Sequence, residues 1–233
     1  MGLFNKIIDW DKGVLLTLNS FHLPWLDRFM WLFSQTIMWL PVLLLLIYVL
    51  FHNKREQALF LIVLFALLIL FTDQISSGVI KHLVARFRPT HDPEIGNLVN
   101  IVNNYKGGDY GFVSSHAANV FAFAGLSLLL FKNWYYTVAI LLWASIVSFS
   151  RIYLGVHFPL DVICGALFGF LSSVAFYYLY TTIFERHASH YDYDRRSSQM
   201  TSSNYRKNDL YLLILSLFMV VCTMLFASFN LAW

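Results

Sequence analysis

Six long apolar segments dominate this sequence of 233 residues. They cover residues 29–51, 57–79, 114–131, 134–152, 158–181 and 209–231. An apolar helix of about 20 residues is long enough to cross the hydrocarbon core of a bilayer. Only 12% of the residues are charged, which is about half the share found in soluble domains. The sequence therefore predicts an all-α polytopic membrane protein with six transmembrane helices, folded as a single domain over residues 1–233.

Polar residues separate the apolar segments in three longer stretches. Residues 1–28 mix charged side chains such as Asp9 and Lys12 with apolar ones, a pattern that favours a helix lying in the membrane interface. Residues 80–113 form a polar loop between the second and third spans. Residues 185–208 are rich in serine and in charge, which predicts a flexible loop.

Neither a metal nor a cofactor is expected. Cys164 and Cys222 lie within apolar runs, which indicates small core residues rather than a disulfide framework or a CxxC site. His187 and His190 could bind a metal, but loop histidines that are simply solvated are far commoner than metal ligands. The formal net charge of +3 is small, so nucleic acid is not an expected partner.

Six crossings place alternate loops on opposite sides of the membrane. The N-terminus, the loops 80–113 and 152–157 and the C-terminus share one side, and the loops 52–56, 132–133 and 182–208 share the other. Each side carries eight basic residues, but three on the first side belong to the candidate site below, which leaves five there. The positive-inside rule then puts the second side in the cytoplasm. We expect a protein of the cytoplasmic (inner) membrane whose first side faces the periplasm or exterior.

Charged and nucleophilic side chains gather at the outward ends of four spans. In chain order they are Lys81, Arg88, Ser114, Ser115, His116, Ser150, Arg151, His157 and Asp161. Lys81 and Arg88 follow the second span, and Ser114, Ser115 and His116 begin the third. Ser150 and Arg151 end the fourth span, and His157 and Asp161 begin the fifth. Cations, histidines, serines and one carboxylate on one side of the membrane predict an anion site that contains a nucleophile.

These residue types suit a phosphate group. The N-terminal ends of the third and fifth spans present unpaired backbone N–H groups and a positive dipole end. Arg88 and Arg151 offer planar forks that match phosphate oxygens, and Lys81 offers a point charge. Ser114 and Ser115 can add hydroxyl or backbone donors. The same donors would stabilise the extra charge of a five-coordinate phosphoryl transition state.

The two histidines could divide the chemistry. His157 and Asp161 are four residues apart, hence on one helix face if the fifth span has begun there. A carboxylate bonded to one imidazole nitrogen fixes the tautomer and leaves the other nitrogen free to attack phosphorus. His116 can then donate a proton to the departing oxygen as a general acid.

Each residue also has a simpler interpretation when it is taken alone. A serine at a helix start is commonly a cap, and cations at the end of a span commonly extend to the interface. His116 alone would be a hydrogen-bonded interface histidine. The His157–Asp161 pair is harder to explain in this way, because ionisable groups inside a membrane are usually functional. Asp73 and Gln74, deeper in the second span, are expected to serve helix packing.

Three short motifs carry a resemblance to a known family. They are "KHLVARFRP" from Lys81 to Pro89, "VSSH" from Val113 to His116, and "SRIYLGVHFPLD" from Ser150 to Asp161. The sequence resembles the type 2 phosphatidic acid phosphatase (PAP2) family, which is related to the vanadium haloperoxidases and has the signature K-x6-R-P, P-S-G-H and S-R-x5-H-x3-D. Val113 and Ser115 depart from the middle motif. Neither change removes a reacting group, but together they leave the set of phosphate donors open.

The resemblance implies a role for each matching residue. His157 would form a phosphohistidine, oriented by Asp161, and His116 would protonate the leaving group and then help to activate water. The phosphate would be held by Lys81, Arg88, Ser114, Ser115 and Arg151. The family needs no metal, so the resemblance implies a metal-independent lipid phosphatase that works at the outer face of the membrane.

The substrate and two rival functions stay open. Undecaprenyl pyrophosphate, phosphatidylglycerol phosphate, phosphatidic acid and lipid A phosphate all fit as substrates, and membrane lipids are the other expected partners. A lipid phosphotransferase would use the same phosphohistidine but pass the phosphoryl group to an alcohol. A phosphate or lipid transporter is a weaker alternative, because transporters place their sites near the midplane between repeats, whereas the charges here collect at one side.

Overall fold

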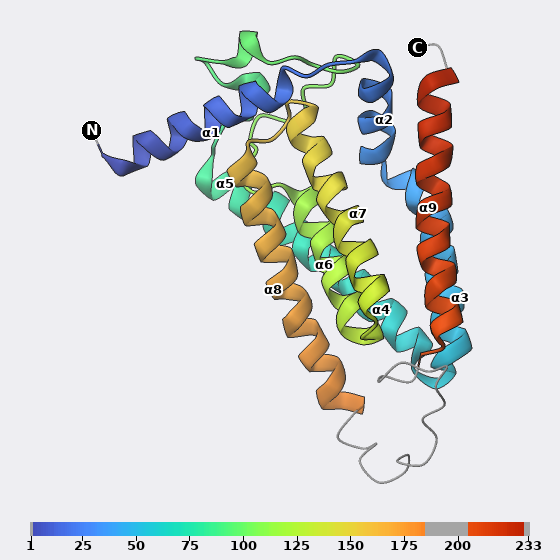
Figure 1. Cartoon of the computed structure of the whole chain (residues 1–233). Helices are drawn as coiled ribbons and strands as arrows, with labels where there is room; N and C mark the ends of the chain where they lie inside the picture. Colours follow the sequence, from blue (N-terminus) through green and yellow to red (C-terminus); the bar gives the residue numbers. More distant parts are fainter. Residues whose placement is uncertain (1, 185–204, 231–233) are drawn as a thin grey trace.

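A computed structural model describes residues 2–184 and 205–230, and this described part is a bundle of helices without a strand (Figure 1). Five stretches are apolar and long enough to cross a membrane, namely Thr36–Asn53, Arg55–Val84, Trp134–Tyr153, Pro159–Phe184 and Lys207–Asn230. A sixth apolar helix, Ser115–Phe131, is 17 residues long. The predicted all-α polytopic membrane architecture is confirmed.

The elements follow one another along the chain with short connections. They are α1 (Leu3–Asn19), α2 (Pro24–Ser34), η1 (Thr36–Trp39), α3 (Leu40–Asn53), α4 (Arg55–Asp73), η2 (Gln74–Ile80), α5 (Lys81–Val84), η3 (Pro89–His91), η4 (Gly96–Leu98), α6 (Ser115–Phe131), α7 (Trp134–Tyr153), α8 (Pro159–Phe184) and α9 (Lys207–Asn230).

The first predicted span, 29–51, is wrong as a continuous helix. Gln35 is extended, with φ −82° and ψ 120°, and it separates α2 from η1 and α3. Pro41 does not kink a helix, because it lies in the first turn of α3, where its missing N–H has no helical partner to lose. The chain therefore crosses the bundle here in two pieces.

The predicted C-terminal end of the second span, residue 79, is wrong because the helix continues beyond it. The helical conformation continues from α4 through the π-helical η2 into α5 and stops at Ala85, whose φ of 49° is left-handed. Lys81 therefore lies on a helix rather than in the loop that was predicted to start at residue 80. This extension brings the Lys81 ammonium group against the start of α6.

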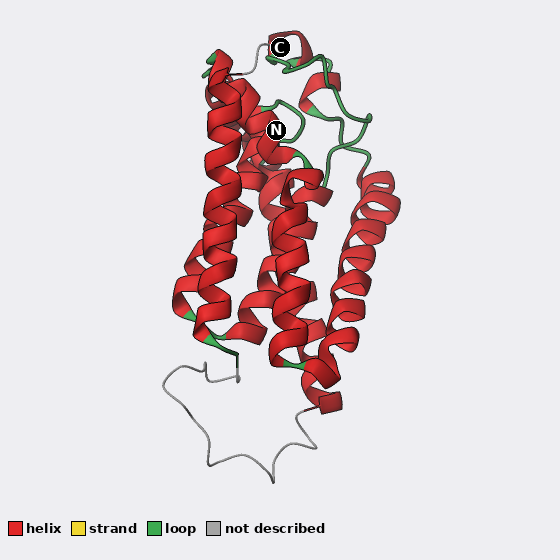
Figure 2. Ribbon diagram, turned by 90° about the vertical axis from the view of Figure 1, so that its right-hand side faces the viewer, coloured by secondary structure: helices red, strands yellow, loops and turns green. Residues whose placement is uncertain are grey.

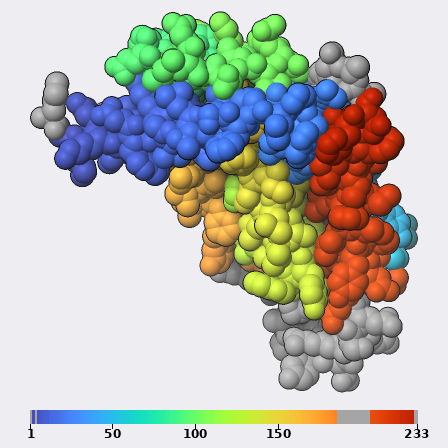
Figure 3. Space-filling view, turned by 45° about the horizontal axis from the view of Figure 1, so that its top comes forward, coloured from blue at the N-terminus to red at the C-terminus, as the bar shows by residue number. Residues whose placement is uncertain are grey.

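Helix α1 lies across one end of the bundle (Figures 1 and 3). Leu3 and Trp10 are 75% and 56% exposed, whereas Asp11 and Leu15 are fully buried. The interfacial helix predicted for 1–28 thus corresponds to α1, but the predicted boundary is wrong because α2 already begins at Pro24. Helix α2 turns into the bundle and packs against α7 and α9.

Among the connections that the structure describes in full, the longer ones lie at the α1 end of the bundle (Figure 2). The loops from Ala85 to Ser114 and from Leu154 to Phe158 both lie there, as the predicted six-span arrangement requires. Short turns around Lys54 and Lys132 join helices at the other end. Most of the loop predicted to be flexible, 185–208, falls outside the described residues.

Glycines allow α6 and α8 to approach each other closely. A side chain at Gly169 would collide with the backbone carbonyl of Ala118, and one at Gly125 would collide with Ser173. A Cβ at Gly165 would lie 2.5 Å from the carbonyl oxygen of Ser114. Gly165 and Gly169 are four residues apart, the GxxxG spacing with which membrane helices commonly pack closely. This close contact holds the first turn of α6 against the first turns of α8.

Candidate active site

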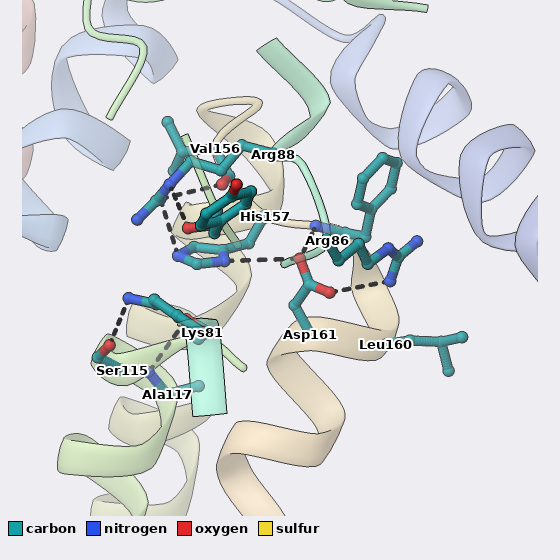
Figure 4. A network of polar contacts seen from close by, with 12 residues as sticks. Lys81, Arg86, Arg88, Ser115, Ala117, Val156, His157, Leu160 and Asp161 are labelled. Atoms are coloured by element: carbon teal, nitrogen blue, oxygen red, sulfur yellow. Dashed lines mark hydrogen bonds and ion pairs between the residues drawn. The ribbon is translucent and has the colours of Figure 1, made fainter. Parts of the chain in front are cut away.

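The structure brings together, at the α1 end of the bundle, the eight residues to which the sequence assigns a role in the site. They come from α5, α6, α7, α8 and two loops, and they are Lys81, Arg88, Ser114, Ser115, His116, Arg151, His157 and Asp161. Figure 4 shows Lys81, Arg88, Ser115, His157 and Asp161 among them. Both histidines interact electrostatically with all three cations of this group. Groups far apart in sequence therefore share one electropositive centre.

His157 lies at the middle of the group, in the loop between α7 and α8, and is only 1% exposed. Its Nε2 is 3.0 Å from Arg88 Nη1. Arginine has no acceptor and stays protonated, so Nε2 accepts this hydrogen bond and its lone pair points toward the guanidinium. The neutral ring then carries its proton on Nδ1. This is the tautomer in which Nε2 can act as a nucleophile.

Arg88 is fixed by the loops around it. Its Nη1 also donates to the carbonyl oxygen of Val156 at 3.1 Å, and its Nε donates to the carbonyl oxygen of Tyr110 at 3.1 Å. The backbone of Gly107, with φ 71°, passes so close that a Cβ there would lie 3.0 Å from the Arg88 guanidinium. The planar fork is therefore held in place before any ligand arrives.

Asp161 lies on the other side of the His157 ring. Its Oδ2 is 3.6 Å from Nδ1 of His157, which is beyond hydrogen-bond range. The hydrogen bond that the sequence predicts is thus absent, and Oδ2 instead accepts from the N–H of Phe158 at 3.0 Å. The backbone of Gly111 packs on this carboxylate, since a Cβ at Gly111 would lie 2.9 Å from Oδ2.

The two serines at the start of α6 differ in what they can offer a phosphate. Ser114 caps the helix by accepting from Ala117 N at 3.4 Å, and its own N–H donates to the Asp161 carbonyl at 2.9 Å. Its backbone donor is therefore already used. The hydroxyl of Ser115 lies 2.7 Å from Lys81 Nζ, so these two groups face one location together.

Arg151 reaches the site from the last turn of α7 and is 3% exposed. Its Nη1 donates to the hydroxyl of Ser34, and its guanidinium carbon lies 5.8 Å from the centre of the Tyr105 ring. Its Nε has no hydrogen-bond partner among the described residues. Sequence reasoning missed Ser34 and Tyr105, because no motif marks either residue.

Sequence reasoning also missed a third arginine and a second carboxylate. Arg86 lies 2.9 Å from Asp161 Oδ1 and 2.7 Å from Asp11 Oδ2. Arg86 was visible in "KHLVARFRP" as a second arginine beside Arg88. Asp11, Leu15 and Asn19 are four residues apart and all buried on one helix face. This spacing was the signal in the sequence that could have indicated a buried Asp11.

Burial and charge keep His157 neutral. Burial is the largest cause that lowers the pKa of the His157 imidazole well below its ordinary value of 6.5, and Arg88, Arg151 and Lys81 act in the same direction. A protonated ring here would lie among three cations without water. The imidazole is therefore neutral near pH 7, as a nucleophile must be.

His116 lies between this centre and an apolar cavity of about 670 Å³. The cavity is bounded mainly by apolar residues of η1, α3, α4, α6 and α7, with Asp73 and Asn119 among its few polar groups. Asn119 donates to Asp73 at 3.2 Å and accepts from the Thr72 hydroxyl at 2.8 Å. Asp73 thus links α4 to α6, in agreement with the packing role predicted for it.

Among the residues that the structure describes, no three His, Cys, Asp or Glu side chains lie close enough to hold a metal ion. His187 and His190, which were considered as possible ligands, lie outside that part of the chain. Metal independence stays a prediction for solution experiments.

The chain is similar to known proteins both in sequence and in fold. Residues 59–185 match the model of the PAP2 superfamily. A lipid A 4'-phosphatase of Bacteroides thetaiotaomicron is 39% identical over 73% of this chain and 77% of its own length. An undecaprenyl-diphosphatase of Sulfolobus acidocaldarius is 32% identical over 70% of each chain. A PAP2 type phosphatidylglycerolphosphate phosphatase from Bacillus subtilis shares the fold, with a TM-score of 0.58 at 21% identity over 81% of this chain and 90% of that one.

Proposed function

The chain belongs to the PAP2 superfamily, and we propose that it hydrolyses the phosphate group of a membrane lipid through a phosphohistidine on His157, without a metal. One observation carries this proposal. Nε2 of His157 lies 3.0 Å from the fork of Arg88. Because the guanidinium can only donate, Nε2 is the acceptor and carries no proton, so a nucleophile and a phosphate-binding group lie side by side.

In the first half of the reaction, the phosphate binds between Arg88, Arg151 and Lys81. His157 Nε2 attacks phosphorus, the bond from phosphorus to the lipid oxygen breaks, and His116 gives its proton to that oxygen. As the P–N bond forms, the ring gains positive charge. Asp161 lies 3.6 Å from Nδ1 and would draw closer to stabilise that charge.

In the second half, water attacks the phosphohistidine from the side that the lipid alcohol has left. His116, now neutral, accepts a proton from this water, the P–N bond breaks, and inorganic phosphate is released. Arg88 and Lys81 stabilise the equatorial oxygens in both transition states. His157 returns to its neutral form and His116 to its protonated form, so the cycle is balanced.

The apolar cavity beside His116 supports a lipid as the leaving group. Its rim includes Ile37, Leu40 and Leu43, which are 65%, 43% and 43% exposed on the outside of the bundle. In a membrane these side chains would face hydrocarbon. An acyl or isoprenyl chain could pass from the bilayer into the cavity while its phosphate reaches His157.

Lipid A phosphate is our first candidate substrate. The similarity to the Bacteroides lipid A 4'-phosphatase covers about three quarters of both chains. The match to the family model, residues 59–185, includes the whole region from Lys81 to Asp161. The undecaprenyl-diphosphatase relative makes undecaprenyl pyrophosphate the second candidate. Phosphatidylglycerol phosphate and phosphatidic acid complete the test panel.

The proposed function is tested by phosphate release from that panel in detergent micelles with EDTA present. We expect release from at least one lipid, with a rate that EDTA leaves unchanged within about twofold, because side chains alone supply the charge that a metal would supply elsewhere. A rate that EDTA abolishes and one divalent ion restores would contradict the metal-free mechanism. Loss of the lipid phosphate to an added alcohol, with no inorganic phosphate released, would identify a phosphotransferase instead.

We also propose that the α1 end of the bundle faces the periplasm or exterior. The test uses single cysteines at Asn97→Cys, on the α1 end, and Glu56→Cys, at the other end, in a chain whose Cys164 and Cys222 are replaced by serine. Both test positions are exposed. A membrane-impermeant thiol reagent added to whole cells should label position 97 only. Labelling of position 56 alone would invert the orientation.

A further inference from the structure

Helix α1 reaches the catalytic centre through one buried carboxylate, that of Asp11. This side chain has no exposed surface, although it belongs to a helix whose other face is open. Isolated buried charges are costly, so a buried aspartate is normally held by defined partners. Asp11 has two such partners, and both belong to the site.

The first partner is Arg86. Asp11 Oδ2 lies 2.7 Å from Arg86 Nη2, while Arg86 Nη1 lies 2.9 Å from Asp161 Oδ1. The guanidinium carbon of Arg86 also lies 4.0 Å from the centre of the Phe158 ring. One planar cation thus bridges two carboxylates from helices 150 residues apart, and an aromatic ring fixes its plane.

The second partner is the beginning of α8. Asp11 Oδ1 accepts a hydrogen bond from the N–H of Leu160 at 3.0 Å. Leu160 is the second residue of α8 and directly precedes Asp161. Asp11 therefore satisfies one of the unpaired N–H groups of the first helical turn. It holds both the cation that contacts Asp161 and the turn that carries Asp161.

Other contacts keep α1 in register with the site. Lys12 pairs with Asp92 at 3.1 Å and Glu94 at 2.7 Å. Asn19 donates to the carbonyl oxygen of Tyr153 at 2.7 Å and accepts from Asn100 N at 2.8 Å. The C-terminal half of α1 is thus anchored directly beside Asp11, at Lys12, and at its last residue, Asn19.

We propose that Asp11 is a positioning residue for the reaction: it fixes Arg86, and Arg86 fixes Asp161 beside the His157 ring. The inference rests on the proposed phosphohistidine function. It makes α1 part of the active site, whereas an interfacial helix alone would serve only attachment to the membrane. Since Asp161 is 3.6 Å from His157, its exact placement decides how well it stabilises the charged ring.

The test variant is Asp11→Asn, with Asp9→Asn as its matched control. Asparagine retains a carbonyl oxygen for the Leu160 N–H but loses the charge that holds Arg86. Asp9 is on the same helix and is exposed, so the control removes an equal charge without touching the site. Replacing the partners that orient a metal-ligating histidine typically changes activity about 10–100-fold, and we take this range as the guide for Asp11, which acts on His157 through Arg86 and Asp161. We expect a loss of kcat in this range for Asp11→Asn, with KM and the inhibition constant of inorganic phosphate unchanged within about twofold.

Two further variants test the chain of contacts. Asp11→Glu keeps the charge and should recover part of the lost kcat. The double variant Asp11→Asn with Arg86→Gln should lose no more than Arg86→Gln alone, because both residues act through one contact to Asp161. If the fold-losses of kcat in the two single variants multiplied in the double variant, Asp11 would act independently of Arg86, and the inference would be overturned. A parallel fall in kcat, phosphate affinity and thermal stability would reduce Asp11 to a purely structural residue.

A measurement without turnover separates this inference from the proposed function. The ring nitrogens of His157 can be followed by NMR on histidine labelled with ¹⁵N, with resonances assigned by their absence in His157→Gln. We expect Asp11→Asn to shift them and Asp9→Asn to leave them in place. If the wild type releases no phosphate from any lipid, the proposed function fails, and these resonances still decide the role of Asp11. Unshifted resonances in Asp11→Asn would overturn it.

Discussion

Replacement of His157 by alanine should lower turnover at least about 10⁴-fold, since removal of a nucleophile leaves only binding and transition-state electrostatics. The wild type should form a phosphoenzyme when it is mixed with substrate labelled with ³²P and denatured within one turnover. The label should be stable to alkali and labile to acid, as expected for a P–N bond. His157→Ala should carry no label.

The control for this result is His82→Ala. His82 is an exposed histidine at the same end of the bundle, so its removal tests whether the loss of any nearby imidazole matters. We expect near-normal turnover for this variant. His157→Gln guards against a folding defect, because it fills most of the buried space that alanine would leave empty. Near-normal turnover in either His157 variant, in protein with an unchanged melting temperature, would refute the nucleophile assignment.

Arg88→Lys should lower kcat/KM about 10²–10³-fold, which is the cost of removing one well-placed donor to a transition-state oxyanion. A lysine keeps the charge but not the planar fork. It could not serve the carbonyl groups of Tyr110 and Val156 and the ring of His157 at once, all of which Arg88 contacts within 3.1 Å. Binding of inorganic phosphate should weaken as well, and its inhibition constant is the second measurement.

Arg55→Lys provides the matched control for Arg88→Lys. Arg55 is exposed at the opposite end of the bundle, and the same chemical change there should leave kcat/KM and phosphate inhibition unaltered. If Arg88→Lys retained wild-type kcat/KM, the guanidinium would be acting as a simple charge. The fork would then have no special part in binding phosphate.

The fold was predictable to the extent that hydropathy reports contact with lipid. Six apolar segments identified the bundle, because each must bury its backbone polar groups inside a helix. Hydropathy carries no information about a single extended residue such as Gln35, so the break in the first span was missed. It also ended the second span at residue 79, because the polar Lys81 and His82 follow, although the helical conformation continues to Val84.

The site was predictable where its residues lie at the ends of spans, since the parity of crossings fixes which ends meet. Asp161 and Arg151 are such residues. Arg86 and Asp11 required knowledge of how α1 lies on the bundle, and an amphipathic pattern fixes the buried face of a helix but not what that face touches. The 3.6 Å between His157 and Asp161 likewise depends on packing around Gly111, which no spacing rule contains.

The glycine contact between α6 and α8 has a consequence for how the products separate. Because Gly125 and Gly169 leave no room between these two helices, a lipid chain cannot pass there, whereas the cavity beside His116 opens toward η1 and α3. The lipid alcohol would therefore diffuse sideways into the bilayer on the α3 flank. Inorganic phosphate would leave through the loops at the α1 end, into water. Each product would depart into the phase that dissolves it, the lipid alcohol first and inorganic phosphate after the attack of water.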